Sequence, residues 1–161
     1  MAAARPRSLA PDEILGELLG LDPGLRLEPY WGERAIFYNP GGAAPLGVIV
    51  AAIKDHDGPN DRSARLSRAG VYRFAFGIRP ETFVRLCGEI PARPNKGGVV
   101  ALAGYDPARI DELMPHPVYG WMSWVQILTP TAPRFRSLRP LLAESLELGP
   151  GEVAAPHRAR R

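Results

Sequence analysis

Residues 71–78, VYRFAFGI, are the segment that most constrains the fold. Aromatic side chains stand at Tyr72, Phe74 and Phe76, and the positions between them carry other residue types, including Arg73. A period of two places successive side chains on opposite faces of a strand. The segment therefore predicts a strand with one aromatic face in the core and a second face that displays Arg73.

Three further stretches of the chain have the composition of strands. Residues 24–42 hold two short β-rich runs on either side of Gly32 and Glu33, which predicts a hairpin closed at residues 39–42. Residues 46–53, LGVIVAAI, predict a third strand that is apolar enough to be central. Residues 121–128 predict the last strand of the sheet.

Apolar residues at helical spacing occur near both ends of the chain. Residues 11–20 begin with a proline and two acids, which suit the first turn of a helix. Two short helices are predicted at residues 80–88, with Leu86 on the apolar side, and at residues 106–114, between Asp106 as cap and Pro115 as stop. A final helix runs to about residue 148 and is either kinked by Pro140 or begins there.

This order of elements predicts an α+β fold. We expect a single domain at residues 8–150, in which the N-terminal and C-terminal helices pack on one face of a mainly antiparallel sheet. Residues 1–7 and 151–161 are expected to be disordered tails. Residues 54–68 are polar and contain Gly58 and Pro59, so they predict a long loop, and long loops often have a function.

The net charge of +3 and the pI near 9.3 invite a nucleic-acid function, but the distribution of charge argues against it. Of the 20 basic and 17 acidic residues, 15 and 16 lie between residues 8 and 150, so the expected domain is near neutral. The N-terminus lacks the apolar run of a signal peptide, and no stretch is long enough for a membrane span. With Cys87 as the only cysteine, these features predict a cytoplasmic protein without a membrane partner.

Residues 114–130, MPHPVYGWMSWVQILTP, are the part of the chain richest in functional groups. Histidine exchanges protons near neutral pH, and tryptophan and tyrosine offer large flat faces with one polar edge. An alternative interpretation is that the two tryptophans pack beneath helices and the histidine hydrogen-bonds a turn. The segment predicts a pocket for a planar or apolar ligand, lined by His116, Tyr119, Trp121 and Trp124, with Arg73 as a further candidate.

Two other groups of polar residues are candidate sites. Asp55, His56 and Asp57 could join His116 in a metal or proton-transfer site, but their spacing matches no standard metal motif, which favours a solvated loop. Arginines are also close in sequence and could bind a phosphate or carboxylate, although a solvated and partly paired set is favoured. These arginines are Arg62, Arg65, Arg68, Arg73 and Arg79.

The motifs of several enzyme classes are absent from the sequence. It contains no phosphate-binding Gly-Lys loop, no dinucleotide fingerprint and no paired-cysteine zinc motif. Cys87 is expected near the C-terminus of a helix, where the helix dipole disfavours a thiolate nucleophile. We therefore predict no cofactor and no metal, assign no catalytic residue and lean towards a protein that is not an enzyme.

The residues at 68–94, 111–131 and 139–148 closely resemble an actinobacterial family of unknown function, number 6194. The most specific parts are LMPHPVYG, the later Trp124 and the RPLLAES helix. More distantly, the order of elements is similar to the MmcQ/YjbR family, which implies helices on a curved antiparallel sheet. That likeness carries over only His116 and Trp124 as candidate site residues, together with a DNA-binding function.

Three hypotheses follow from the sequence. The first is a non-catalytic domain that binds an unknown small molecule or protein through the aromatic and histidine pocket. The second is nucleic-acid binding, which the MmcQ/YjbR likeness implies and the near-neutral domain disfavours. The third is a small cofactor-independent hydrolase or isomerase that uses His116 with Asp55 or His56.

Overall fold

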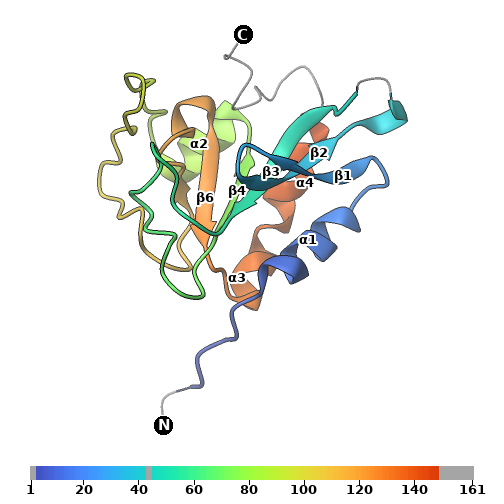
Figure 1. The fold of residues 1–161 in the computed structure, drawn as a ribbon, viewed down its shortest axis with the longest axis horizontal. Helices are drawn as coiled ribbons and strands as arrows, with labels where there is room; N and C mark the ends of the chain where they lie inside the picture. The colour runs from blue at the N-terminus through green and yellow to red at the C-terminus, as the bar shows by residue number, and fades with distance from the viewer. Residues whose placement is uncertain (1–2, 43–44, 149–161) are drawn as a thin grey trace.

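The alternating segment forms β4 (Arg73–Gly77), an internal strand of a six-stranded antiparallel sheet (Figure 1). The structure is a computed structural model and describes residues 3–42 and 45–148. The strand order is β1-β2-β3-β4-β6-β5. The other strands are β1 (Leu25–Tyr30), β2 (Glu33–Tyr38), β3 (Val48–Lys54), β5 (Met114–Pro115) and β6 (Trp124–Leu128).

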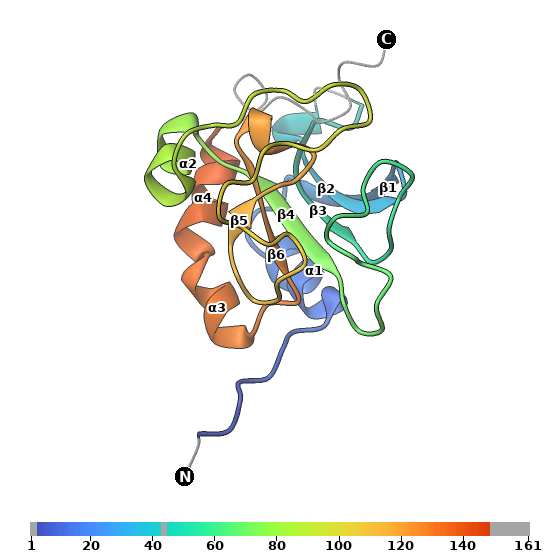
Figure 2. The ribbon, with the colours of Figure 1, turned by 90° about the vertical axis from the view of Figure 1, so that its left-hand side faces the viewer.

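Four α-helices in the described residues contribute to one core on the same face of this sheet. They are α1 (Pro11–Leu19), α2 (Pro80–Cys87), α3 (Ala132–Ser137) and α4 (Arg139–Glu147). Figure 2 shows α2, α3 and α4 along one side of β4 and β6, with α1 farther from the viewer and overlapped by β6. The predicted α+β fold, with N-terminal and C-terminal helices on one face of an antiparallel sheet, is confirmed.

The core on the helix side contains the aromatic row that the sequence predicts. Phe74 and Phe76 are fully buried, and Phe135 from α3 meets Phe74 edge to face at 5.9 Å between ring centroids. Ile14 of α1 and Leu142 of α4 belong to the same cluster. Because burial of apolar side chains is the main favourable term in folding, this core holds the helices on the sheet.

Loops cover the opposite face of the sheet, which we call the second face. Figure 2 shows the connections on either side of β4, drawn in green and yellow, running over this side. The loop after β3 carries a small apolar cluster of its own, in which Ala64 and Leu66 pack on Leu128 of β6. The long loop expected at residues 54–68 is therefore anchored on the sheet by buried side chains.

The helix predicted at residues 106–114 is wrong. Asp106 accepts a hydrogen bond from the Ala108 amide at 3.0 Å, but this caps a single turn. Asp111 has a positive φ of 62° and its carboxylate accepts a hydrogen bond from the Thr131 amide at 2.8 Å, while Met114 pairs with Gln126 in the sheet. Pairing with β6 satisfies the backbone groups that a helix would have paired internally.

Smaller differences concern the ends and faces of elements. The last strand begins at Trp124 instead of residue 121, because residues 120–122 form a 3-10 turn and Ser123 has a positive φ of 64°. Leu86, predicted on the core side of α2, is 41% exposed. The final helix is interrupted at Leu138, and α4 starts with Pro140 in its first turn, as one of the two predicted alternatives requires. The expected tails lie outside the described residues at 1–2 and 151–161.

Substitution of two glycines by alanine is expected to have opposite effects on stability, because their backbone conformations differ. Gly16 lies within α1, and Gly70 has a φ of +73°; a Cβ at either position would meet nothing within 4 Å. Gly16→Ala is expected to raise the free energy of unfolding by about 0.5–1 kcal/mol, because alanine loses less backbone entropy in a helix. Gly70→Ala is expected to lower it by about 1–2 kcal/mol, because a left-handed backbone strains an L-residue. Urea denaturation measures both, and equal effects would contradict the prediction.

Candidate functional site

The candidate site lies on the second face, where β-strand register places small and large side chains in successive rows. The middle row runs across β2, β3, β4 and β6 through Ala35, Ala52, Ala75 and Gln126, which are paired in this order. All three alanines are buried. We call these three residues the alanine row.

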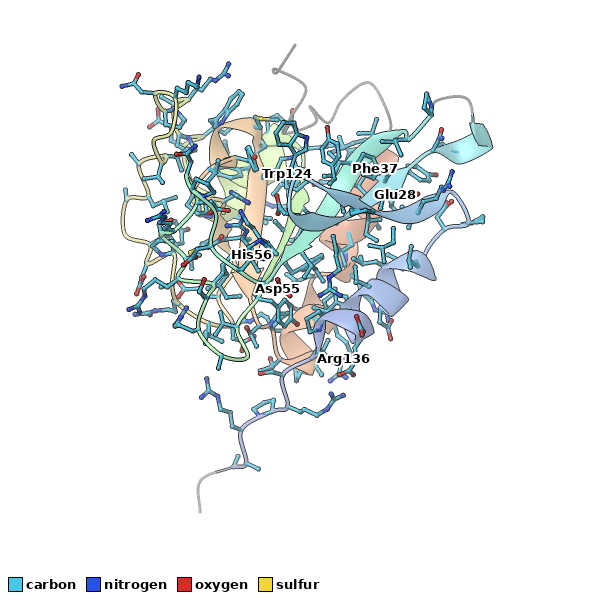
Figure 3. All side chains as sticks on the ribbon, viewed as in Figure 1. Glu28, Phe37, Asp55, His56, Trp124 and Arg136 are labelled. Carbon is cyan, nitrogen blue, oxygen red and sulfur yellow. The ribbon has the colours of Figure 1, made fainter. Side chains whose placement is uncertain are left out.

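Large apolar side chains lie in the row on one side of the alanine row. Phe37 and Trp124 belong to the same buried cluster as the three alanines, and Tyr30 meets Phe37 edge to face at 5.3 Å between ring centroids. Tyr119 and Met122 are partly buried against this cluster. Figure 3 places Trp124 and Phe37 at the same end of the sheet. Together they give the small alanines an aromatic border.

A buried ion cluster lies on the other side of the alanine row. The Arg73 guanidinium is 0% exposed and donates to both carboxylate oxygens of Asp61, at 2.9 and 2.5 Å. Lys54 Nζ donates to Asp61 Oδ2 at 2.9 Å, and Glu33 Oε1 lies 3.8 Å from Arg73 Nη2. Two cations and two acids thus meet beneath the loop, an arrangement that requires each charge to keep its partner.

The pKa shifts in the ion cluster follow from burial and from these contacts. Burial by itself would raise the pKa of the Asp61 carboxyl, but the hydrogen bonds and charge of Arg73 outweigh it and hold that pKa well below its usual value. For Glu33 burial is the largest effect and raises the pKa, against the opposing charges of Arg73 and Lys54. Of the two acids Asp61 and Glu33, Asp61 is therefore the one whose folded environment favours the ionised form.

His116 is buried next to this cluster and is 1% exposed. Its Nδ1 accepts hydrogen bonds from the amides of Val118 and Tyr119, both at 3.0 Å, so the ring is neutral with its proton on Nε2. Burial lowers its pKa well below the usual value, and the positive charge of Arg73 adds to this. The Tyr119 ring lies 4.9 Å from the His116 ring, between centroids.

Four buried polar atoms have no hydrogen-bond partner among the described residues. One is Ser63 Oγ in the loop after β3, and the three on the strands of the second face are Trp124 Nε1, Gln126 Oε1 and Arg73 Nε. Trp124 is 1% exposed and Gln126 is 0% exposed. Buried polar atoms are nearly always paired, so three unpaired atoms on neighbouring strands call for an explanation.

The structure distributes the sequence-predicted pocket residues over two places. His116, Tyr119, Trp124 and Arg73 contribute to the second face, through the buried cluster around Trp124 or the ion cluster. Trp121 lies in the 3-10 turn at Gly120–Met122, with the Arg93 guanidinium carbon 4.6 Å from its ring centroid. A cation over a tryptophan face is a favourable contact of its own.

The prediction of a solvated and partly paired set of arginines is wrong for Arg73, which is completely buried in the ion cluster. Arg68 is held by three backbone carbonyls, those of Ala64, Arg65 and Ala108, at 2.8–3.1 Å. Arg68 connects the loop after β3 to the backbone of Ala108, and Arg73 connects β4 to Asp61 of the same loop.

The polar residues directly after β3 do not gather around His116. His56 is paired with Asp55 at 3.0 Å, and both side chains are more than half exposed, at 55% and 61%. Asp57 accepts a hydrogen bond from the Leu66 amide at 2.8 Å, which closes the loop. In the described residues no group of three or more histidine, cysteine, aspartate and glutamate side chains could hold a metal ion.

Sequence reasoning missed Asp61, Lys54 and Glu33 as parts of this site, and it noted Gln126 among the functional groups of residues 114–130 without assigning it to the pocket. Gln126 lies two residues after Trp124 on the last strand, so the period of two of a strand places both side chains on the same face. Asp61 lies in a loop, and no local pattern indicates that it reaches Arg73, twelve residues away.

The cavities found among the described residues are not lined by the alanine row or the ion cluster, and two of them include Arg68 or Cys87 in their lining. One, of about 700 Å³, is lined by the N-terminal segment and residues 68–72, including Arg7, Arg68 and Tyr72. The other, of about 340 Å³, is lined by Cys87, Tyr105, Pro115 and apolar residues. Burial raises the pKa of the Cys87 thiol to about 11, so this cavity holds no thiolate at neutral pH.

Comparison with known proteins places this arrangement in a family. No curated protein and no solved structure matches the chain. None of the helices in the described residues is long and apolar enough to cross a membrane. The model of a family described as "Family of unknown function (DUF6194)" matches residues 9–157, which includes every residue of the alanine row and the ion cluster. The chain therefore belongs to this family of unknown function.

Proposed function

We propose that the protein is a non-catalytic binding domain for a small planar ligand, which lies on the alanine row of the second face. The observation that carries this proposal is the indole N–H of Trp124, which is buried and has no partner among the described residues. A buried donor without a partner costs about 1–3 kcal/mol. A ligand that accepts this hydrogen bond would recover that free energy.

The shape of the second face supports a flat ligand. Three consecutive strands carry small alanine side chains in this row, and Phe37 and Trp124 belong to the same buried cluster. Aromatic side chains favour contact with flat, apolar molecules. Entry would require Tyr119 and Met122 to move, and both are only partly buried.

The arrangement of the titratable groups favours binding over catalysis. In the hydrolase or isomerase hypothesis His116 works with Asp55 or His56, yet those two side chains are exposed and paired with each other, whereas His116 is buried. The Nδ1 atom of His116 is already occupied by two backbone amides. General acid-base catalysis needs such groups within hydrogen-bond reach of one substrate.

Nucleic-acid binding, which the distant MmcQ/YjbR likeness implies, is the alternative. Arg134 and Arg136 are exposed on α3, and neither makes an ion pair with a described residue. Phosphate contacts would make the affinity fall steeply with salt. Binding of duplex or single-stranded DNA at low salt, lost in Arg134→Ala/Arg136→Ala, would favour this alternative.

Filling the alanine row tests the proposed function. Ala75→Val adds two methyl groups at the centre of the row and is expected to weaken binding of flat bicyclic probes at least about tenfold, because interiors are close-packed. Ala101→Val adds the same atoms at the 340 Å³ cavity and is the matched control. Titration by calorimetry measures the dissociation constants, and thermal unfolding verifies that both variants fold. Equal binding by Ala75→Val and the unsubstituted protein would refute the proposed location.

A further inference from the structure

The three unpartnered atoms of the second face lie in three successive rows of the sheet. Trp124 pairs with Gly77, Gln126 with Ala75, and Leu128 with Arg73, so Gln126 lies in the row between Trp124 and Arg73. Trp124 Nε1 and Arg73 Nε each carry a hydrogen, and Gln126 Oε1 carries lone pairs. The unpaired groups therefore form the order donor, acceptor, donor.

The orientation of the Gln126 amide is fixed by its other contact. Its Nε2 donates to the Pro107 carbonyl at 3.1 Å, and a carbonyl accepts only from the nitrogen side of the amide. The oxygen is consequently the atom that has no partner. This rules out the flipped amide, which would change the order of the groups.

We infer that the ligand of the proposed site carries an imide edge, a planar N–H flanked by two carbonyl groups. This inference rests on the proposed function. The two carbonyls would accept from Trp124 Nε1–H and Arg73 Nε–H, and the N–H between them would donate to Gln126 Oε1. Gln126 itself lies in the middle row on β6, and Arg73 is a long side chain in the next row on the neighbouring strand β4.

The charges of the neighbouring ion cluster favour a neutral group over an anion. Arg73 and Lys54 face Asp61 and Glu33, so the two cations already have two acids. Nη1 and Nη2 of Arg73 each donate to Asp61, so Nε is the one guanidinium nitrogen without a partner among the described residues. An added carboxylate or phosphate would bring an uncompensated charge into a buried site, which is unfavourable.

A set of four probes with the same bicyclic frame distinguishes recognition of the imide edge from recognition of a flat ring system. Phthalimide has both carbonyls and the N–H, isoindolin-1-one has one carbonyl and the N–H, N-methylphthalimide has both carbonyls without the N–H, and indane has none of these groups. We expect phthalimide to bind at least about tenfold more tightly than N-methylphthalimide, because methylation leaves Gln126 Oε1 unpaired beneath a bound ligand. Isoindolin-1-one should have an intermediate affinity.

The variant Trp124→Phe tests the donor directly, with Trp121→Phe as the matched control outside the alanine row. Nuclear magnetic resonance titrations follow the indole N–H signals, of which the chain has three. Phthalimide should shift the Trp124 signal in the unsubstituted protein. Trp124→Phe should weaken phthalimide binding about tenfold and leave indane binding within about twofold, because the aromatic ring is retained. Trp121→Phe should change neither.

The outcomes distinguish this inference from the proposed function. If the four probes bind at the alanine row with equal affinity, the site exists and the imide inference is wrong. If none of them shifts the Trp124 signal, both are wrong. If phthalimide is preferred but Trp124→Phe binds it as tightly as the unsubstituted protein, the assignment of the Trp124 donor is overturned.

Discussion

Asp61→Ala is expected to lower the free energy of unfolding by about 3–5 kcal/mol, the largest loss that we predict for a single substitution. The change leaves the guanidinium of Arg73, which is 0% exposed, without the carboxylate to which it makes two hydrogen bonds. It also removes the partner of Lys54. A buried charge that loses its partner costs several kcal/mol, much more than an exposed ion pair contributes. Urea denaturation at pH 7 measures the change.

Two controls show whether the effect comes from the unpaired buried charge. Asp55→Ala removes an aspartate from the exposed pair with His56 in the same loop and should cost less than about 1 kcal/mol. The double variant Arg73→Met/Asp61→Leu replaces the main ion pair by apolar side chains and should be more stable than Asp61→Ala. If Asp61→Ala and Asp55→Ala were equally stable, the ion cluster would not be important for folding.

Acidification is expected to destabilise the protein in two steps, and His116 is responsible for the first. Its pKa in the folded protein is well below 6.5, because the ring is buried and faces the positive charges of Arg73 and Lys54, against the negative Asp61. The unfolded chain therefore binds a proton that the folded chain does not. Stability is fully present above about pH 6.5 and falls by about 1.4 kcal/mol per pH unit below it, until the folded protein also binds the proton.

The variant His116→Asn isolates this contribution. An asparagine oxygen can accept hydrogen bonds from the Val118 and Tyr119 amides, as Nδ1 does, but the side chain does not titrate. Urea denaturation between pH 7.5 and pH 5 should give a flatter stability profile for the variant, by one proton. Identical slopes in the two proteins would show that another group binds the proton.

Asp61 is expected to cause the second step, at lower pH. Its pKa is lowered in the folded protein, so its contribution is present above the usual carboxyl pKa of 3.8 and is lost as the pH falls further. Glu33 acts in the opposite direction, because a raised pKa favours the folded state when this acid is protonated. The acid limb of the profile should therefore shrink in Asp61→Asn, which cannot titrate at this position.

Local sequence patterns predicted the elements whose side chains alternate or repeat regularly. The aromatic row of β4 identifies both the strand and its core face, since a strand exposes every second side chain to the same environment. Pro11 and Pro140 occupy the first turns of α1 and α4, where a proline is tolerated. At residues 106–114 the same helix signals failed, because pairing with β6 outweighed local preference.

The sequence by itself determined the fold class and the helix-side core, because these depend on periodic burial and on residues close in the chain. Only the tertiary structure decided what Arg73 does. The alternation assigns Arg73 to the non-aromatic face of β4, but the loop that buries it and the Asp61 carboxylate that neutralises it reach that face through long-range contacts. The burial and pairing of a charge are properties of the assembled face, to which β2, β3, β4 and two loops contribute, and no local pattern encodes them.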